Sequence, residues 1–205
     1  MVETRSEPVG MARTNDGRQV ITRYATVAVV LHWLIAALLL MNIALAWSRG
    51  FITREQAGMV MDFHKSTGIL ILLLSLVRLG WRLAHPSPPY PAGLPGWERG
   101  LAHVTQWGFY VVMIAMPLTG WVMTSSPRAN GPLTLYGLIS GPLLGFVHTA
   151  QGSMGAIWHS VGEAHGVLAW LAYVLIVLHV GGALKHQFVD RDVIMARMLP
   201  ARRPR

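Results

Sequence analysis

Four histidines lie inside long apolar stretches of this 205-residue chain. His32 interrupts the run RYATVAVVLHWLIAALLL, His64 opens FHKSTGILILLL, and His165 and His179 share HGVLAWLAYVLIVLHV. A titratable side chain is costly in hydrocarbon and needs a partner. For any one of these histidines taken alone, a carbonyl oxygen on a neighbouring helix would be a sufficient partner. The spacing of all four indicates a more specific chemistry.

The four histidines form two pairs at two depths. If the stretches are helices, His32 lies about 12 Å and His179 about 10 Å from one face of the membrane, whereas His64 and His165 each lie about four residues from the other face. His165 and His179 are 14 positions apart in the sequence. That spacing is about 21 Å along a helix and about 40° around it. Two imidazoles at each depth suit two b-type haems with bis-histidine ligation, which carry electrons across a bilayer.

Other sites for these histidines fit the sequence less well. A zinc or copper site would normally add cysteines or carboxylates, but the chain has no cysteine, and apart from Glu163 we expect no carboxylate at these pairs. The lack of cysteine also excludes covalently attached c-type haem. A proton relay would need acidic residues within the membrane. A haem-free transporter or scaffold is a third class, and it predicts a colourless protein.

The elements that position the histidines are four predicted membrane-spanning helices. The chain is 53% hydrophobic and only 13% charged, against about 25% charged in soluble domains. Apolar runs long enough to span a bilayer occur at about residues 24–47, 60–83, 101–123 and 161–188. The prediction is an all-α membrane protein, a four-helix bundle with two b haems in its core. Pro117 is expected to kink the third helix.

Basic residues predict the orientation of the bundle. The net charge is +8, but the basic residues flank apolar runs, which favours contact with anionic lipid and excludes a nucleic-acid interface. With both termini in the cytoplasm, thirteen Lys and Arg lie inside and four outside, namely Arg49, Arg54, Lys65 and Arg128. We expect a mobile cytoplasmic tail over residues 1–22, the membrane domain over 23–190, and a basic cytoplasmic tail over 191–205. The outer loop, 125–158, is expected to hold a short interfacial helix.

Several motifs together resemble the bacterial cytochrome b561 family, which includes superoxide oxidases. They are RYATVAVVLHW, FHKSTGILILLLSLVRLGWRL, PSPP, GLAH and EAHGVLAWLAYVLIVLHVGGALKH, in this order over about residues 20 to 200. The resemblance implies a multi-pass protein of the bacterial inner membrane with two non-covalent haem b groups. It implies that His32 and His179 hold the cytoplasmic-side haem and that His64 and His165 hold the outer one. It also implies electron transfer from superoxide to ubiquinone.

Three further residues are candidates for cofactor binding on the cytoplasmic side. Arg78 lies at the depth of the inner haem and could pair with a haem propionate, or extend toward water instead. His186 lies two turns beyond His179 and could exchange a proton with a quinone carbonyl, or simply interact with the carbonyls at the helix end. Trp33 could pack on the haem or quinone, or belong to the bundle core.

Lys65 and Arg54 are the candidates for catalysis at the outer face. Either could attract a small anionic electron donor such as superoxide, although ordinary charges beside a membrane explain them as well. An alternative function is a haem-bearing membrane anchor that relays electrons for a dehydrogenase or hydrogenase complex. The predicted partners are therefore quinone, lipid and the anionic donor, with a soluble redox protein or a second copy of the chain as further possibilities.

Overall fold

Four long helices dominate the computed structural model, which describes residues 11–13, 19–21, 23–90, 93–125, 133–141, 144, 147 and 154–199. The helices are α1 (Thr26–Ser48), α2 (Arg54–Ala84), α3 (Gly96–Ser125) and α5 (Met154–Leu184). Each is long and apolar enough to cross a membrane. The predicted fold class is confirmed, and the chain is a multi-pass membrane protein.

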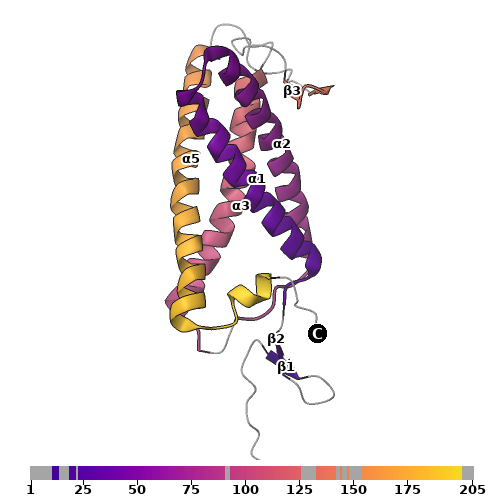
Figure 1. Ribbon diagram of the computed structural model, residues 1–205, viewed down its shortest axis with the longest axis vertical. Helices are drawn as coiled ribbons and strands as arrows, with labels where there is room; N and C mark the ends of the chain where they lie inside the picture. Colours follow the sequence, from indigo (N-terminus) through magenta and orange to yellow (C-terminus); the bar gives the residue numbers. More distant parts are fainter. Residues whose placement is uncertain are drawn as a thin grey trace, which may run out of the picture.

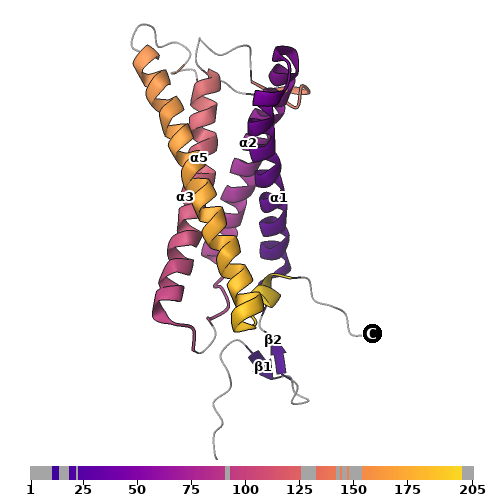
Figure 2. The same ribbon diagram turned by 60° about the vertical axis from the view of Figure 1, so that its left-hand side comes forward.

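The helices form an elongated bundle in which α1 packs on α2, α2 on α3, and α3 on α5. Figure 2 shows the pair α1 and α2 on one side and the pair α3 and α5 on the other. We call the end where α1 begins and α5 ends the tail end (Figure 1). The opposite end, where α2 begins and α3 ends, is the hairpin end. The two histidine pairs lie toward different ends of the bundle.

Short elements complete the fold. A 3-10 turn, η1 (Arg49–Phe51), joins α1 to α2, and α5 continues as a π-helical segment, η2 (Lys185–Asp190), before a second 3-10 turn, η3 (Met195–Met198). Strand β1 (Met11–Arg13) pairs antiparallel with β2 (Gln19–Ile21), and β3 (Thr134–Leu135) pairs antiparallel with β4 (Ile139–Ser140).

Local sequence explains where α2 begins and ends. Thr53 and Gln56 form a capping box, in which the Gln56 N–H donates to Thr53 Oγ1 at 3.3 Å and the Thr53 N–H donates to Gln56 Oε1 at 3.0 Å. The helix therefore starts before the predicted residue 60, in a stretch too polar to be recognised by hydropathy. Its C-terminal end precedes the proline-rich segment that begins at Pro86. In contrast, Pro117 lies inside α3, which continues to Ser125.

Two apolar clusters hold the helices together. Ile35, Ile71 and Met113 join α1, α2 and α3, whereas Val112, Ala172 and Leu175 join α3 and α5. Many large apolar side chains elsewhere on these helices are exposed, as expected for surfaces that face lipid.

The structure describes only part of the connecting and terminal segments. The described part of the outer loop forms the β3–β4 hairpin. The predicted interfacial helix falls largely on residues that the structure does not describe. At the C-terminus, residues 191–199 do not extend away as a separate tail but bind back to the start of α1. Most of the predicted N-terminal tail also lies outside the described residues.

Close approach of α3 and α5 depends on Gly108. A Cβ atom added there would lie 3.2 Å from Leu175 Cδ2, whereas one added at Gly100 on the same helix would meet nothing within 4 Å. We expect Gly108→Val to destabilise the bundle by about 1–3 kcal/mol more than Gly100→Val, because only the former overpacks an interface. Thermal unfolding of the two purified variants in the same detergent measures the difference. Equal melting temperatures would contradict this account of the interface.

Candidate functional site

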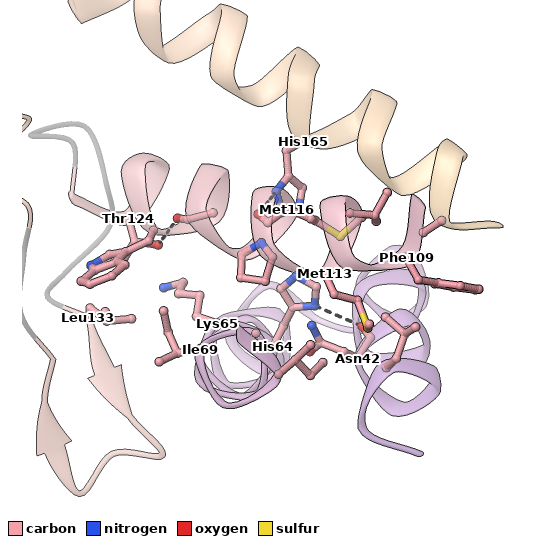
Figure 3. A pocket seen from close by; sticks show the side chains of 18 residues that line it. Asn42, His64, Lys65, Ile69, Phe109, Met113, Met116, Thr124, Leu133 and His165 are labelled. Carbon is pink, nitrogen blue, oxygen red and sulfur yellow. Dashed lines mark hydrogen bonds between the residues drawn. The ribbon is translucent and has the colours of Figure 1, made fainter. Parts of the chain in front are cut away.

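His64 and His165 line a single cavity at the hairpin end, which they enter from α2 and α5 (Figure 3). Most of the remaining lining is apolar, and half of the remaining residues belong to α3, including Met113 and Met116. The two imidazoles are close enough to interact electrostatically. The structure therefore brings together one pair that the sequence predicted from depth alone.

Hydrogen bonds fix the tautomer of both imidazoles. His64 Nδ1 lies 3.1 Å from the carbonyl oxygen of Asn42, which only accepts, so Nδ1 carries the proton. His165 Nδ1 lies 3.1 Å from the Met116 carbonyl oxygen and 2.8 Å from Thr119 Oγ1. Because the Thr119 hydroxyl gives its one proton to the Met116 carbonyl at 2.6 Å, His165 Nδ1 is again the donor. The Nε2 lone pair is left free in both rings.

This arrangement is the one that metal-binding histidines normally have. A histidine that binds a metal through one nitrogen usually donates its other N–H to a carbonyl or carboxylate, which fixes the ring and raises its basicity. Here α1 and α3 supply those acceptors for ligands that belong to α2 and α5. At Gly120, a Cβ atom would lie 3.5 Å from His165 Cε1, an ordinary van der Waals distance, so the ring packs closely against α3.

His32 and His179 form the second pair, toward the tail end. Their ring centroids are 5.9 Å apart and their planes are inclined by 65°. Two imidazole nitrogens that bind one metal ion from opposite sides, each about 2 Å away, leave ring centroids about 6 Å apart. The edge of Phe109 packs against His179 at 5.5 Å between centroids. Both pairs thus present a donor set that fits axial ligation of a haem iron.

Arg78 accompanies the tail-end pair. Its guanidinium carbon lies 5.8 Å from the centroid of the Tyr110 ring, and the charge interacts electrostatically with His32 and His179. A half-buried cation beside this pair provides a counter-charge for an anionic group, and the carboxylates of haem are such groups.

The β3–β4 hairpin covers α2 next to the hairpin-end cavity. The Tyr136 N–H donates to Ser66 Oγ at 2.9 Å, and Leu133 reaches the cavity itself. Tyr136 and Gly137 have φ angles of 52° and 71°, the positive values of a type I′ turn. Contacts of the Tyr136 side chain with Phe63 and Thr67 hold this unusual backbone in place.

Lys65 and Arg54, the two predicted donor-attracting residues, have different positions. Lys65 lines the cavity beside His64 and forms an ion pair with Asp62 at 2.9 Å. Arg54 is the exposed first residue of α2, ten positions before His64. That separation is about 15 Å along the helix. The structure therefore places Lys65, but not Arg54, at the histidine pair.

His186 lies in a network of charged groups at the tail end. Its Nδ1 is 2.7 Å from Asp192 and 3.2 Å from Asp190, and its Nε2 is 3.9 Å from Glu98. Lys185 joins the same carboxylates, at 2.9 Å from Glu98 and 2.6 Å from Asp190. Glu98, His186 and Asp190 are close enough to hold a metal ion, but the Lys185 ammonium already forms an ion pair with each of the two acids.

Trp33 was predicted either to pack on the haem or quinone or to belong to the bundle core. Its side chain is half-exposed, so it does not belong to the core. The edge of its ring packs against His32 at 5.2 Å between centroids, and its indole N–H donates to the Met198 carbonyl at 2.8 Å. It therefore links the tail-end histidine pair to the C-terminal segment.

The sequence reasoning missed the groups that orient the histidines. Asn42 and Thr119 are polar residues inside apolar helices, a signal that was available, but nothing in the sequence connects them to histidines on other helices. The contribution of the Asn42 and Met116 backbone carbonyls has no sequence signal at all. Arg197 was counted only as a charge in a tail, although it is 3% exposed.

The chain is similar to known proteins over most of its length. A family model described as prokaryotic cytochrome b561 matches residues 23–201. A probable superoxide oxidase CybB of Yersinia pestis is 30% identical over 185 residues, which cover 88% of this chain and 98% of that protein. Cytochrome b561 homolog 2 of Escherichia coli (strain K12) is 30% identical over 186 residues, covering 86% of this chain and 91% of that protein.

The Thr119 hydroxyl should strengthen metal binding by His165. We expect Thr119→Val to weaken retention of one haem by about 10–100-fold, because it removes the closer acceptor of the Nδ1 proton. The measurement is haem per chain against time in the presence of excess apomyoglobin. Thr105→Val, a matched change at a buried position of the same helix, is the control. Equal retention by both variants would contradict the role of Thr119.

Proposed function

The chain belongs to the prokaryotic cytochrome b561 family, and from that premise we propose that it is a di-haem membrane oxidoreductase that passes single electrons from superoxide at one face of the membrane to ubiquinone near the other. The observation that carries the proposal is the presence of two imidazole pairs, His64 with His165 and His32 with His179, toward opposite ends of one bundle. The similarity to a probable superoxide oxidase supports the choice of donor.

Haem b held by two histidines supplies one-electron redox chemistry without an open coordination position. The chain's own residues fix where that chemistry occurs. The Asn42 and Met116 carbonyls and the Thr119 hydroxyl hold His64 and His165 in the tautomer that leaves Nε2 free. His165 and His179 share α5, so a single rigid helix sets the separation of the two centres along the membrane normal.

At the hairpin end, the chain controls access of the donor. The Lys65 ammonium lies beside His64 in a cavity that is otherwise largely apolar, and it attracts a small anion more strongly there than in open water. The β3–β4 hairpin packs over α2 beside this cavity. A small anion such as superoxide suits a cavity of this kind, with one cationic side chain among apolar ones.

At the tail end, the chain supplies protons. Two superoxide ions give two electrons and leave as dioxygen, and one ubiquinone takes these electrons with two protons to become ubiquinol. His186, held by Asp190 and Asp192, is positioned to pass a proton from water to a quinone carbonyl. The excess of Lys and Arg toward this end favours a cytoplasmic location, and hence the bacterial inner membrane.

Reconstitution tests the function directly. In vesicles that contain the purified chain and ubiquinone, superoxide produced by xanthine oxidase should reduce the haems and generate ubiquinol. His165→Ala and His179→Ala should each bind one haem per chain instead of two and form no ubiquinol, because each breaks the electron path. A wild-type protein that keeps both haems but forms no ubiquinol from superoxide would overturn the proposal. Reduction by a co-purified dehydrogenase would then favour the electron-relay alternative.

The charge of Lys65 should set the rate of encounter with the donor. We expect Lys65→Gln to slow superoxide-dependent haem reduction at least about threefold at low ionic strength, with the difference shrinking as salt is added. Arg54→Gln, which removes a more distant exposed charge, should have a smaller effect. Stopped-flow absorbance at the reduced haem band measures both rates. If the two variants behave alike, Lys65 has no special role in attracting the donor.

A further inference from the structure

The C-terminal segment, residues 191–199, is bound to the first turns of α1. The Tyr24 N–H donates to the Arg197 carbonyl at 3.3 Å, and Arg23 Nη1 donates to the carbonyls of Ala196 and Leu199, both at 2.7 Å. The Trp33 indole reaches the Met198 carbonyl. Figure 1 shows this segment turning back across the tail end of the bundle, between α5 and the start of α1.

These contacts bury an arginine side chain that is only partly satisfied. Arg197 is 3% exposed, and its Nη1 donates to the Pro89 carbonyl at 2.6 Å. Its Nε and Nη2 atoms are buried and have no hydrogen-bond partner among the residues that the structure describes. A guanidinium is always charged, and leaving such a charge buried without an anion costs several kcal/mol. The free edge of Arg197 therefore points to an anionic ligand.

The described part of the chain offers no such anion at this place. The carboxylates of Glu98 and Asp190 bind Lys185 and His186, and Asp192 binds His186 and the Ile194 N–H. The charged residue bound to this segment from the start of α1 is itself a cation, Arg23, and it is engaged with the carbonyls of Ala196 and Leu199. Two of the donors of Arg197 thus remain for a planar oxyanion, either a carboxylate or a phosphate.

We propose that Arg197 binds a carboxylate of the haem held by His32 and His179, as a second anchor beside Arg78. Two connections place it next to that pair. Trp33 contacts both the His32 ring and the residue after Arg197, and Tyr24, whose N–H binds Arg197, also interacts with Arg78. Arg197 is almost fully covered by protein, which favours a group held inside the bundle, such as haem, over a lipid phosphate outside it. The inference rests on the haem assignment within the proposed function, but not on superoxide or quinone.

Redox titration of the full-length protein in neutral detergent tests this proposal. Arg197→Gln should move the midpoint potential of one haem to a lower value and leave the other unchanged, because a lost positive charge disfavours the added electron. The haem that responds should be the one missing from His179→Ala. Arg197→Lys, which keeps the charge, should give a smaller shift. Arg99→Gln removes an exposed charge from the same end of the bundle and should change neither potential.

Resonance Raman spectra provide a second measurement if Arg197→Gln does not fold. Arg197→Lys should shift the propionate bending band, which reports hydrogen bonding to the haem carboxylates. Retention of both haems with unchanged potentials and an unchanged band would overturn the proposal. A shift of potential that appears only in vesicles containing phosphatidylglycerol would also overturn it, and would identify the anion as a lipid phosphate. A protein without haem would instead overturn the proposed function.

Discussion

The structure depends on the cost of placing a polar ring inside an apolar bundle. An imidazole has two nitrogens, and neither can be left without a partner in hydrocarbon. At the hairpin end, one nitrogen of each ring is satisfied by a carbonyl from a different helix, through Asn42 for His64 and Met116 for His165. The first bond links α1 to α2, and the second links α3 to α5. Both leave the Nε2 atom of a histidine free, and the two histidines line the same cavity. The fold thereby positions a ligand set that the protein alone cannot satisfy.

The two ends of the bundle have different chemistry. The hairpin end is mainly apolar, with Lys65 beside the cavity and a two-stranded turn packed over α2. The tail end carries an ion network in which two lysine contacts and two histidine contacts tie Glu98 and Asp190 together. One end is suited to a small anion that needs no proton, and the other to a reaction that consumes protons. The π-helical segment η2 carries Lys185, His186 and Asp190, and the first two of these contact Glu98 near the start of α3.

Burial of Arg197 connects the C-terminal segment to the same physical problem. Like the histidine Nε2 atoms, its free guanidinium edge is a polar group without a ligand. Arg23, Tyr24 and Trp33 hold the backbone of this segment against the start of α1. Trp33, the residue after His32, is thus tied to the C-terminal segment, residues 191–199. Both His32 and Arg197 lie at the place where the first helix and the last residues meet.

Hydropathy and helical spacing alone determined the four spans, the all-α class and the pairing of His64 with His165 and of His32 with His179. These properties are local or periodic: a run of about 20 apolar residues must cross the membrane, and a fixed rise per residue converts sequence position into depth. Only the tertiary structure decided which groups orient the rings, that Lys65 and not Arg54 reaches the cavity, and that residues 191–199 return to α1. Backbone carbonyls carry no sequence signature, and contacts such as that between Arg197 and Pro89 join residues more than 100 positions apart. Such contacts arise only when the helices have packed.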